Sequence, residues 1–292
     1  MGAHADAGLI SYGQGFAFWV PRDEPRKLDM LYAVWTHEMA HQWTVPAAIK
    51  EGVGFLAEGL AWYSGMLVVK ESRGDEQLRQ LTTFMRYPYP HRPIRRGEPL
   101  LRALDPYLSY RRGPFAMYAL SEYVGVDRVN GVLRQLIARN DSASALPVTT
   151  LDLYRGLKAV TPDSLQYLLH DLLEVNTFWE FKTNRVKAVE SKGGAWEVTM
   201  DVRARKIVYD SAGNKTELPM DEWIPIGVFG EAAEGHDDFS APLYVGMHRI
   251  RSGEQTITVT VPRKPVRAGI DPYHLLDWEQ PEADDNIARV KS

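Results

Sequence analysis

Two histidines and a glutamate within five residues form the part of this sequence best suited to chemistry. His37, Glu38 and His41 stand in a segment whose pattern predicts a helix. Residues four apart lie on the same face of a helix, so both imidazoles can point to one ion, and neutral imidazole is a good zinc ligand. Glu38 lies about 100° further round the helix than His37 and can act as a base without binding the ion itself. The spacing predicts a metal-assisted hydrolytic site, although histidines at this spacing also occur as ordinary partly buried residues.

A zinc site of this kind needs a third protein ligand, and two glutamates compete for the position. Glu58 follows His41 after sixteen intervening residues and stands in an apolar run. A carboxylate in such a run is costly unless something pairs with it, and a zinc ion would be that partner. Glu51 stands in a predicted loop, where water can solvate it. We therefore expect His37, His41 and Glu58 as the metal ligands.

At these residues the sequence resembles a known family. The run His-Glu-Met-Ala-His-Gln-Trp at 37–43, followed by Glu-Gly-Leu-Ala at 58–61, is similar to the motif of the aminopeptidase N family of zinc metallopeptidases, which are gluzincins. Residues 2–12 lie where the family has its Gly-Ala-Met-Glu-Asn strand, and residues 110–113 resemble its Tyr-x-Lys-Gly. The C-terminal end, from residue 268 to residue 286, is similar to peptidase domains fused to bacterial ABC-type transporter permeases.

The resemblance implies a role for each residue of the motif. Three residues would hold one zinc ion per chain: His37, His41 and Glu58. Glu38 would take the proton of the water that attacks a peptide carbonyl, and Tyr110 would stabilise the oxyanion that forms. Tyr110 is expected only through the resemblance, because a tyrosine near a helix start is most often structural. The neighbouring arginines at 111 and 112 are expected to form a solvated pair, with a guanidinium able to touch a substrate carbonyl.

The sequence also departs from the family. The family has eighteen residues between the second histidine and the glutamate, where this chain has sixteen. A glutamate of the family's first strand binds the free amine of the substrate, and Ala5 occupies that position here. His4 and Asp6 flank it, but neighbouring side chains of a strand point to opposite faces. We therefore expect weak preference for a free N-terminus. The family's N-terminal β domain has no counterpart, so we expect the C-terminal portion of a longer protein.

The hydrophobic pattern divides the chain into a helical part, residues 1–177, and a strand-rich part, residues 178–292. Helices are expected at about residues 26–44, 55–71, 75–87, 113–123, 127–139, 150–160 and 163–175. The first helix should bury the stripe Leu28, Leu31, Tyr32, Trp35 and Met39. In the second part, short runs of alternating apolar and polar residues predict about seven short strands. The fold class is therefore α+β: a helical catalytic domain, which the resemblance implies is thermolysin-like, followed by an all-β immunoglobulin-like sandwich.

Composition limits the partners and the compartment. The net charge of −4 includes no basic surplus for nucleic acid, and the absence of cysteine excludes thiolate ligands and disulfides. No apolar run approaches the roughly 18 residues that span a bilayer. The resemblance implies a peptide substrate and a permease partner or fusion, so the compartment stays open: membrane-associated in such a fusion, otherwise soluble.

Two other functions remain open at this point. One is a catalytically weak binding or regulatory domain of a transporter-associated protein, and the other is a zinc hydrolase for non-peptide substrates. Glu38 and Tyr110 argue against the first, because a scaffold needs neither. Four other histidines are interpreted as structural residues: His170, His236, His248 and His274.

Overall fold

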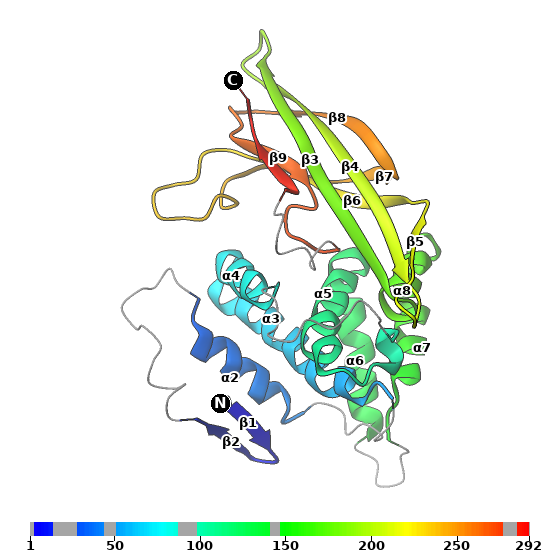
Figure 1. The fold of residues 1–292 in the computed structure, drawn as a ribbon. Helices are drawn as coiled ribbons and strands as arrows, with labels where there is room; N and C mark the ends of the chain where they lie inside the picture. Colours follow the sequence, from blue (N-terminus) through cyan, green and yellow to red (C-terminus); the bar gives the residue numbers. More distant parts are fainter. Residues whose placement is uncertain are drawn as a thin grey trace. The chain divides into compact units, whose positions relative to one another are not determined.

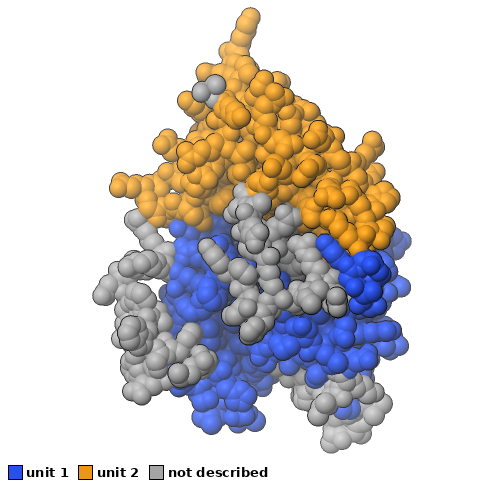
Figure 2. Space-filling model, viewed as in Figure 1, with its two compact units in different colours: residues 1–176, 209–214 blue, residues 177–208, 215–292 orange. Residues whose placement is uncertain are grey.

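The chain forms two compact units in the computed structural model, which describes residues 3–13, 28–43, 51–86, 98–140, 147–276 and 285–291. Unit 1 comprises Met1–Asn176 and Tyr209–Asn214, and unit 2 comprises Thr177–Val208 and Lys215–Ser292 (Figure 2). The first division falls one residue before the boundary expected from the sequence. Tyr209–Asn214 counts with unit 1, where the Tyr209 amide donates to the Asn176 carbonyl.

Helices dominate unit 1 (Figure 1). They are α2 (Met30–Ala40), α3 (Leu60–Arg73), α4 (Asp75–Arg86), α5 (Gly113–Val124), α6 (Val126–Asn140), α7 (Thr150–Val160) and α8 (Gln166–Leu173). Four short helical segments accompany them: η1 (Phe55–Gly59), η2 (Leu100–Arg102), η3 (Leu108–Arg112) and η4 (Asp163–Leu165). A small hairpin, β1 (Ala3–Asp6) and β2 (Leu9–Tyr12), completes the unit. No helix in the described ranges is long and apolar enough to cross a membrane.

The helix positions follow local sequence signals. The clearest is α7, where Thr149 accepts from the Asp152 amide and the Asp152 carboxylate accepts from the Thr149 amide. This reciprocal capping satisfies two amides that a helix start would otherwise leave unpaired, and the Thr-x-x-Asp spacing is its signature in the sequence. The expected first helix, at about residues 26–44, is shorter in the structure: Asp29 caps the start of α2 and the helix ends at Ala40, while residues 26, 27 and 44 lie outside the described ranges.

The buried face of α2 differs from the predicted apolar stripe. Trp35 is 44% exposed, and its ring stacks on Tyr12 of the β1–β2 hairpin at a centroid distance of 5.3 Å. The residues that α2 buries are Ala33, Thr36, His37, Glu38 and Ala40. The prediction was wrong because it ranked residues by hydrophobicity. The helix instead packs the face that carries the histidines against α3, and Trp35 contacts the hairpin.

Unit 2 consists of antiparallel strands. They are β3 (Thr177–Glu190), β4 (Trp196–Tyr209), β5 (Lys215–Leu218), β6 (Asp221–Phe229), β7 (Pro242–Arg251), β8 (Gly253–Val261), β9 (Arg267–Ile270) and β10 (Ile287–Arg289). One sheet has the order β10-β9-β6-β7, and in the other β3, β4 and β5 are neighbours and β8 pairs with β4. The described residues of unit 2 thus form eight strands rather than about seven, because β9 and β10 were not expected and β4 is a single strand where the sequence pattern predicts two.

A buried ion pair lies in the core of unit 2. The Lys206 ammonium donates to Glu222 at 2.8 Å, and the Trp179 indole donates to the other oxygen of the same carboxylate at 2.9 Å. Both charged residues are buried. A buried carboxylate is tolerated here because each of its oxygens has a donor. Along β4 the alternate residues Val198, Met200, Val202 and Ala204 are fully buried, which is the period of two that the sequence indicates.

Candidate metal centre

The side chains of His37, His41 and Glu58 converge on one point in unit 1. The two Nε2 atoms of the histidines are 3.2 Å apart. Glu58 Oε2 lies 3.3 Å from His37 Nε2 and 3.2 Å from His41 Nε2. Tetrahedral zinc with bonds of 2.0–2.1 Å separates its ligand atoms by about 3.3–3.4 Å. The three atoms therefore have nearly the spacing of one face of a zinc tetrahedron, and two imidazoles with one carboxylate are a donor set that zinc accepts.

Backbone features bring Glu58 to the two histidines. Glu58 lies in η1, a π-helical segment that continues directly into α3. A π-helical turn holds an extra residue, so it changes where its side chains point, and such turns are frequent at functional sites. Gly65 of α3 allows the close approach of α2, since a Cβ there would lie 3.2 Å from Thr36 Oγ1 and 3.3 Å from the His37 amide nitrogen.

Electrostatics favour an ionised Glu58 between the imidazoles. Burial alone would raise the pKa of Glu58, but hydrogen bonds from His37 and His41 lower it to about 2. The pKa of His37 is lowered, chiefly by burial. Burial also lowers the pKa of His41, but hydrogen bonding and charge attraction from Glu58 outweigh it and leave the pKa raised. A carboxylate that stays charged at neutral pH is the form that binds a cation.

An aromatic ring positions the first histidine. The rings of His37 and Trp62 stack with centroids 4.3 Å apart and an interplanar angle of 23°. His37 is 4% exposed, and its Nδ1 atom has no hydrogen-bond partner among the described residues. Metal-binding histidines usually donate this second nitrogen to an oxygen acceptor. In the described part of the chain, the indole stack fixes the ring plane instead.

Glu38 is a second buried carboxylate beside the histidine pair. Each of His37, Glu38 and His41 offers a ligand atom, and these atoms lie within 4.8 Å of one another. Glu58 Oε2 lies 3.2–3.3 Å from the Nε2 atoms of both imidazoles, so Glu58 stays the predicted third ligand. Tyr12 of β2 also belongs to this environment, since burial and then the charge of Glu38 raise its pKa to about 12. Sequence reasoning missed Tyr12, because no local signal links β2 to α2.

A cavity of about 360 Å³ opens onto these groups. The described residues that line it are Ala3, His4, Ala5, Met30, Val34, His37, Glu38, His41, Ala57, Glu58, Trp62, Phe84, Tyr110 and Arg111. Tyr110 comes from η3, a second π-helical segment, and its ring centroid lies 6.3 Å from that of His37. The cavity thus gathers the predicted ligands, the predicted base and the predicted oxyanion donor, all within unit 1.

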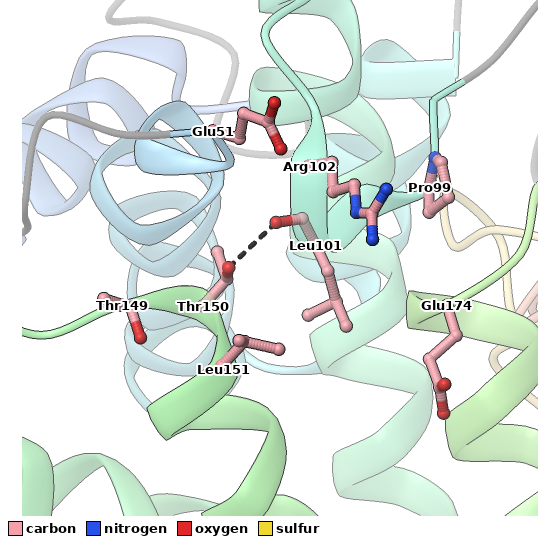
Figure 3. Close-up of a pocket in the computed structure, with 8 residues that line it drawn as sticks. All are labelled: Glu51, Pro99, Leu101, Arg102, Thr149, Thr150, Leu151 and Glu174. Atoms are coloured by element: carbon pink, nitrogen blue, oxygen red, sulfur yellow. Dashed lines mark hydrogen bonds between the residues drawn. The ribbon is translucent and has the colours of Figure 1, made fainter.

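The competing glutamate lies elsewhere. Glu51 lines a different cavity, of about 900 Å³, with Leu101, Arg102 and Glu174 among its walls (Figure 3). The wall of this cavity is held by a hydrogen bond from the Thr150 hydroxyl to the Leu101 carbonyl at 2.8 Å. Glu51 does not line the cavity of the histidines, so the structure separates the two candidates as their sequence settings suggested.

The structure also places Asp6 and Arg112, and it contradicts the prediction made for Arg112. Asp6 is 66% exposed and lies 3.4 Å from His4, so it points away from the face of β1 that carries Ala5. The prediction that Arg111 and Arg112 form a solvated pair is contradicted. Arg112 is 2% exposed and donates to the Asn176 side chain. It is buried because η3 turns it into the protein interior, which the polarity of two adjacent arginines does not reveal.

Comparisons with known proteins find a likeness to solved structures only. No family model and no curated protein matches the chain. A mutant of an M1 zinc metallopeptidase from Deinococcus radiodurans, solved with Tyr-Ser-Ala as bound substrate, is similar at 23% sequence identity and a TM-score of 0.43. The likeness covers 59% of this chain, which spans 37% of the length of that structure. A TM-score this low carries no argument about function.

Proposed function

We propose that this chain is a zinc-dependent hydrolase of peptide bonds. The observation that carries the proposal is the triangle formed by the Nε2 atoms of His37 and His41 and by Glu58 Oε2, whose sides measure 3.2–3.3 Å. The triangle borders a cavity with a buried glutamate on one side and a tyrosine on the other. A pair of histidines with a purely structural role would not require an anionic partner, a base and a cavity at the same place.

The chemistry that zinc supplies when bound is that of a Lewis acid, which makes water more acidic and polarises a carbonyl. In the proposed reaction, Glu38 accepts the proton of the attacking water and then delivers it to the leaving amine. The Tyr110 hydroxyl donates a hydrogen bond to the oxygen of the carbonyl as negative charge develops there. Trp62 holds the plane of the His37 ring. The partly buried cavity strengthens each of these interactions by limiting water.

We further propose a gluzincin-type assignment. The helical unit would be a thermolysin-like catalytic domain, and the strand-rich unit an immunoglobulin-like sandwich. Support for the catalytic domain comes from the predicted ligand pair at the C-terminal end of α2 and from Glu58 in η1, which continues directly into α3. Preference for a free N-terminus should be weak, because Ala5 faces the cavity and Asp6 does not.

Metal analysis combined with peptide hydrolysis tests the proposal. The purified chain should bind one zinc ion and cleave peptides of a fluorogenic library. Glu58→Ala should lower the zinc content sharply, whereas Glu51→Ala, its matched control in the other cavity, should leave it unchanged. Glu38→Gln should keep the metal and lose turnover. Full zinc content in Glu58→Ala would show that the third ligand is misassigned.

The same experiment distinguishes the alternatives. A chain that binds zinc but cleaves neither peptides nor other amide and ester substrates would favour a binding or regulatory domain, for which a transporter permease is the partner suggested by the sequence. Cleavage of esters without cleavage of peptides would favour a hydrolase of non-peptide substrates.

A further inference from the structure

A cationic side chain borders the cavity next to Tyr110. Arg111 follows Tyr110 in η3, and both line the cavity. The Arg111 guanidinium carbon lies 5.9 Å from the centroid of the Phe84 ring, and Phe84 also lines the cavity. A guanidinium within about 6 Å of an aromatic ring is attracted to the ring face, which restricts where the group can lie. Arg111 is therefore a half-buried cation held against one wall of the site.

The described walls of the cavity contain few other charges. The carboxylates among them are Glu38 and Glu58, and Glu58 Oε2 is already within 3.3 Å of both imidazoles. Glu38 is the proposed base. With a divalent ion at the histidines, these walls would carry a net positive charge. A substrate amine would meet repulsion there, whereas a carboxylate would be attracted.

We propose that Arg111 binds a carboxylate of the substrate, so that the site selects peptides with an acidic group close to the scissile bond. The proposal rests on the proposed function. A guanidinium carries five N–H donors in a planar fork that matches a carboxylate, so it can keep contacts within the chain and still receive the substrate group. That group is either a C-terminal carboxylate or the side chain of an aspartate or glutamate.

Two pairs of blocked peptides separate these sources. Acetylated dipeptides ending in a free carboxylate are compared with their C-terminal amides, and an amidated peptide with glutamate after the scissile bond is compared with its glutamine analogue. A hydrogen bond to a charged group contributes enough to change kcat/KM roughly ten- to a hundredfold. We expect the acidic member of at least one pair to be preferred by this factor. Equal rates within both pairs would overturn the proposal.

Variants of Arg111 assign the preference to this residue. Arg111→Gln should abolish the preference, Arg111→Lys should retain part of it, and Arg111→Glu should reverse it in favour of a peptide with lysine at the same position. A reversal is a result that mere loss of packing does not produce. Arg155→Gln, at an arginine that is 74% exposed on α7, is the matched control and should keep the preference of the unmodified chain. Melting temperatures show whether each variant is folded.

Binding measurements keep this proposal separate from the proposed function. Calorimetric titration of the zinc-loaded Glu38→Gln variant with the same acid and amide peptides measures their binding affinities without turnover. Tighter binding of the acid that disappears when Arg111→Gln is added supports the proposal even if no peptide is cleaved. Equal affinity for acid and amide overturns it even if peptides are cleaved.

Discussion

At the scale of single residues, the site contains a buried histidine with a polar partner for only one of its two ring nitrogens among the described residues. His37 is buried with one nitrogen directed at His41 and Glu58, while its other nitrogen has no acceptor in the described part of the chain. Burial without full hydrogen bonding is costly. The indole of Trp62 compensates in part by stacking on the ring. Groups kept incompletely satisfied in this way are typical of sites prepared for a ligand that the chain itself does not supply.

Tyr110 is the residue whose role is most sharply testable. Removing one donor to an oxyanion typically costs about 10²–10³ in kcat. We expect Tyr110→Phe to lower kcat by about this factor and to change KM little, because the hydrogen bond forms mainly in the transition state. Steady-state kinetics on a cleaved peptide measure both constants. Tyr123→Phe on α5, which lies outside the cavity lining, is the control. A loss of tenfold or less would assign the oxyanion to another donor.

At the scale of elements, two π-helical segments form the part of the site that faces α2. η1 carries Glu58, η3 carries Tyr110, and they pack closely because small residues line their contact. A Cβ on Gly54 would lie 2.3 Å from Ser109 Oγ and 3.1 Å from Ser109 Cβ. A Cβ on Gly113 would lie 2.8 Å from the Phe55 ring. Glycines therefore set the spacing between the segment that carries Glu58 and the segment that carries Tyr110.

A double-mutant cycle tests this contact. Gly54→Ala should lower the free energy of unfolding by about 1–3 kcal/mol, because the added methyl group overpacks the contact between η1 and η3. The backbone conformation of Gly54 is already helical, with φ of −60°, so the cost is steric. Adding Ser109→Gly should recover part of the loss, giving a coupling of about 0.5–3 kcal/mol in denaturant titrations.

The control for this cycle is Gly131→Ala in α6. A Cβ there meets only the end of the Arg134 side chain, at 4.0 Å. That change should stabilise the helix by up to about 1 kcal/mol. Strict additivity of Gly54→Ala and Ser109→Gly would mean that the two segments do not limit one another.

At the scale of the whole molecule, the proposed chemistry belongs to unit 1. Both described cavities are lined by residues of unit 1, whereas the buried Lys206–Glu222 pair lies in unit 2. Binding of an ion to the folded state of one unit should stabilise that unit by mass action. Free zinc at a hundred times its dissociation constant should contribute about 2.7 kcal/mol.

Thermal unfolding with and without a chelator should therefore distinguish the unfolding transition of unit 1 from that of unit 2. We expect the chelator to lower the melting temperature of unit 1 and to leave unit 2 unchanged. Lys206→Met should do the reverse, since an unpaired buried carboxylate costs about 3–5 kcal/mol. Hydrogen exchange of amides in α3 and β4 assigns each transition. A chelator effect of equal size on both units would contradict the assignment of the metal to unit 1.

The sequence by itself determined the local properties of this protein. The spacing of His37 and His41 defines a helix face, the Thr149–Asp152 capping box starts α7, and the change of hydrophobic period near Asn176 separates helices from strands. Each of these depends on residues that are close in the chain, so a short window of sequence contains the whole cause.

Only the tertiary structure decided which distant groups meet. It placed Glu58 beside the histidines and Glu51 in another cavity, brought Tyr12 near Glu38, and buried Arg112. These outcomes depend on packing between segments far apart in sequence, where the fit of glycines, π-helical turns and rings outweighs the polarity of a single residue. Local patterns carry no record of that fit, because burial is a property of the neighbours that the folded chain supplies.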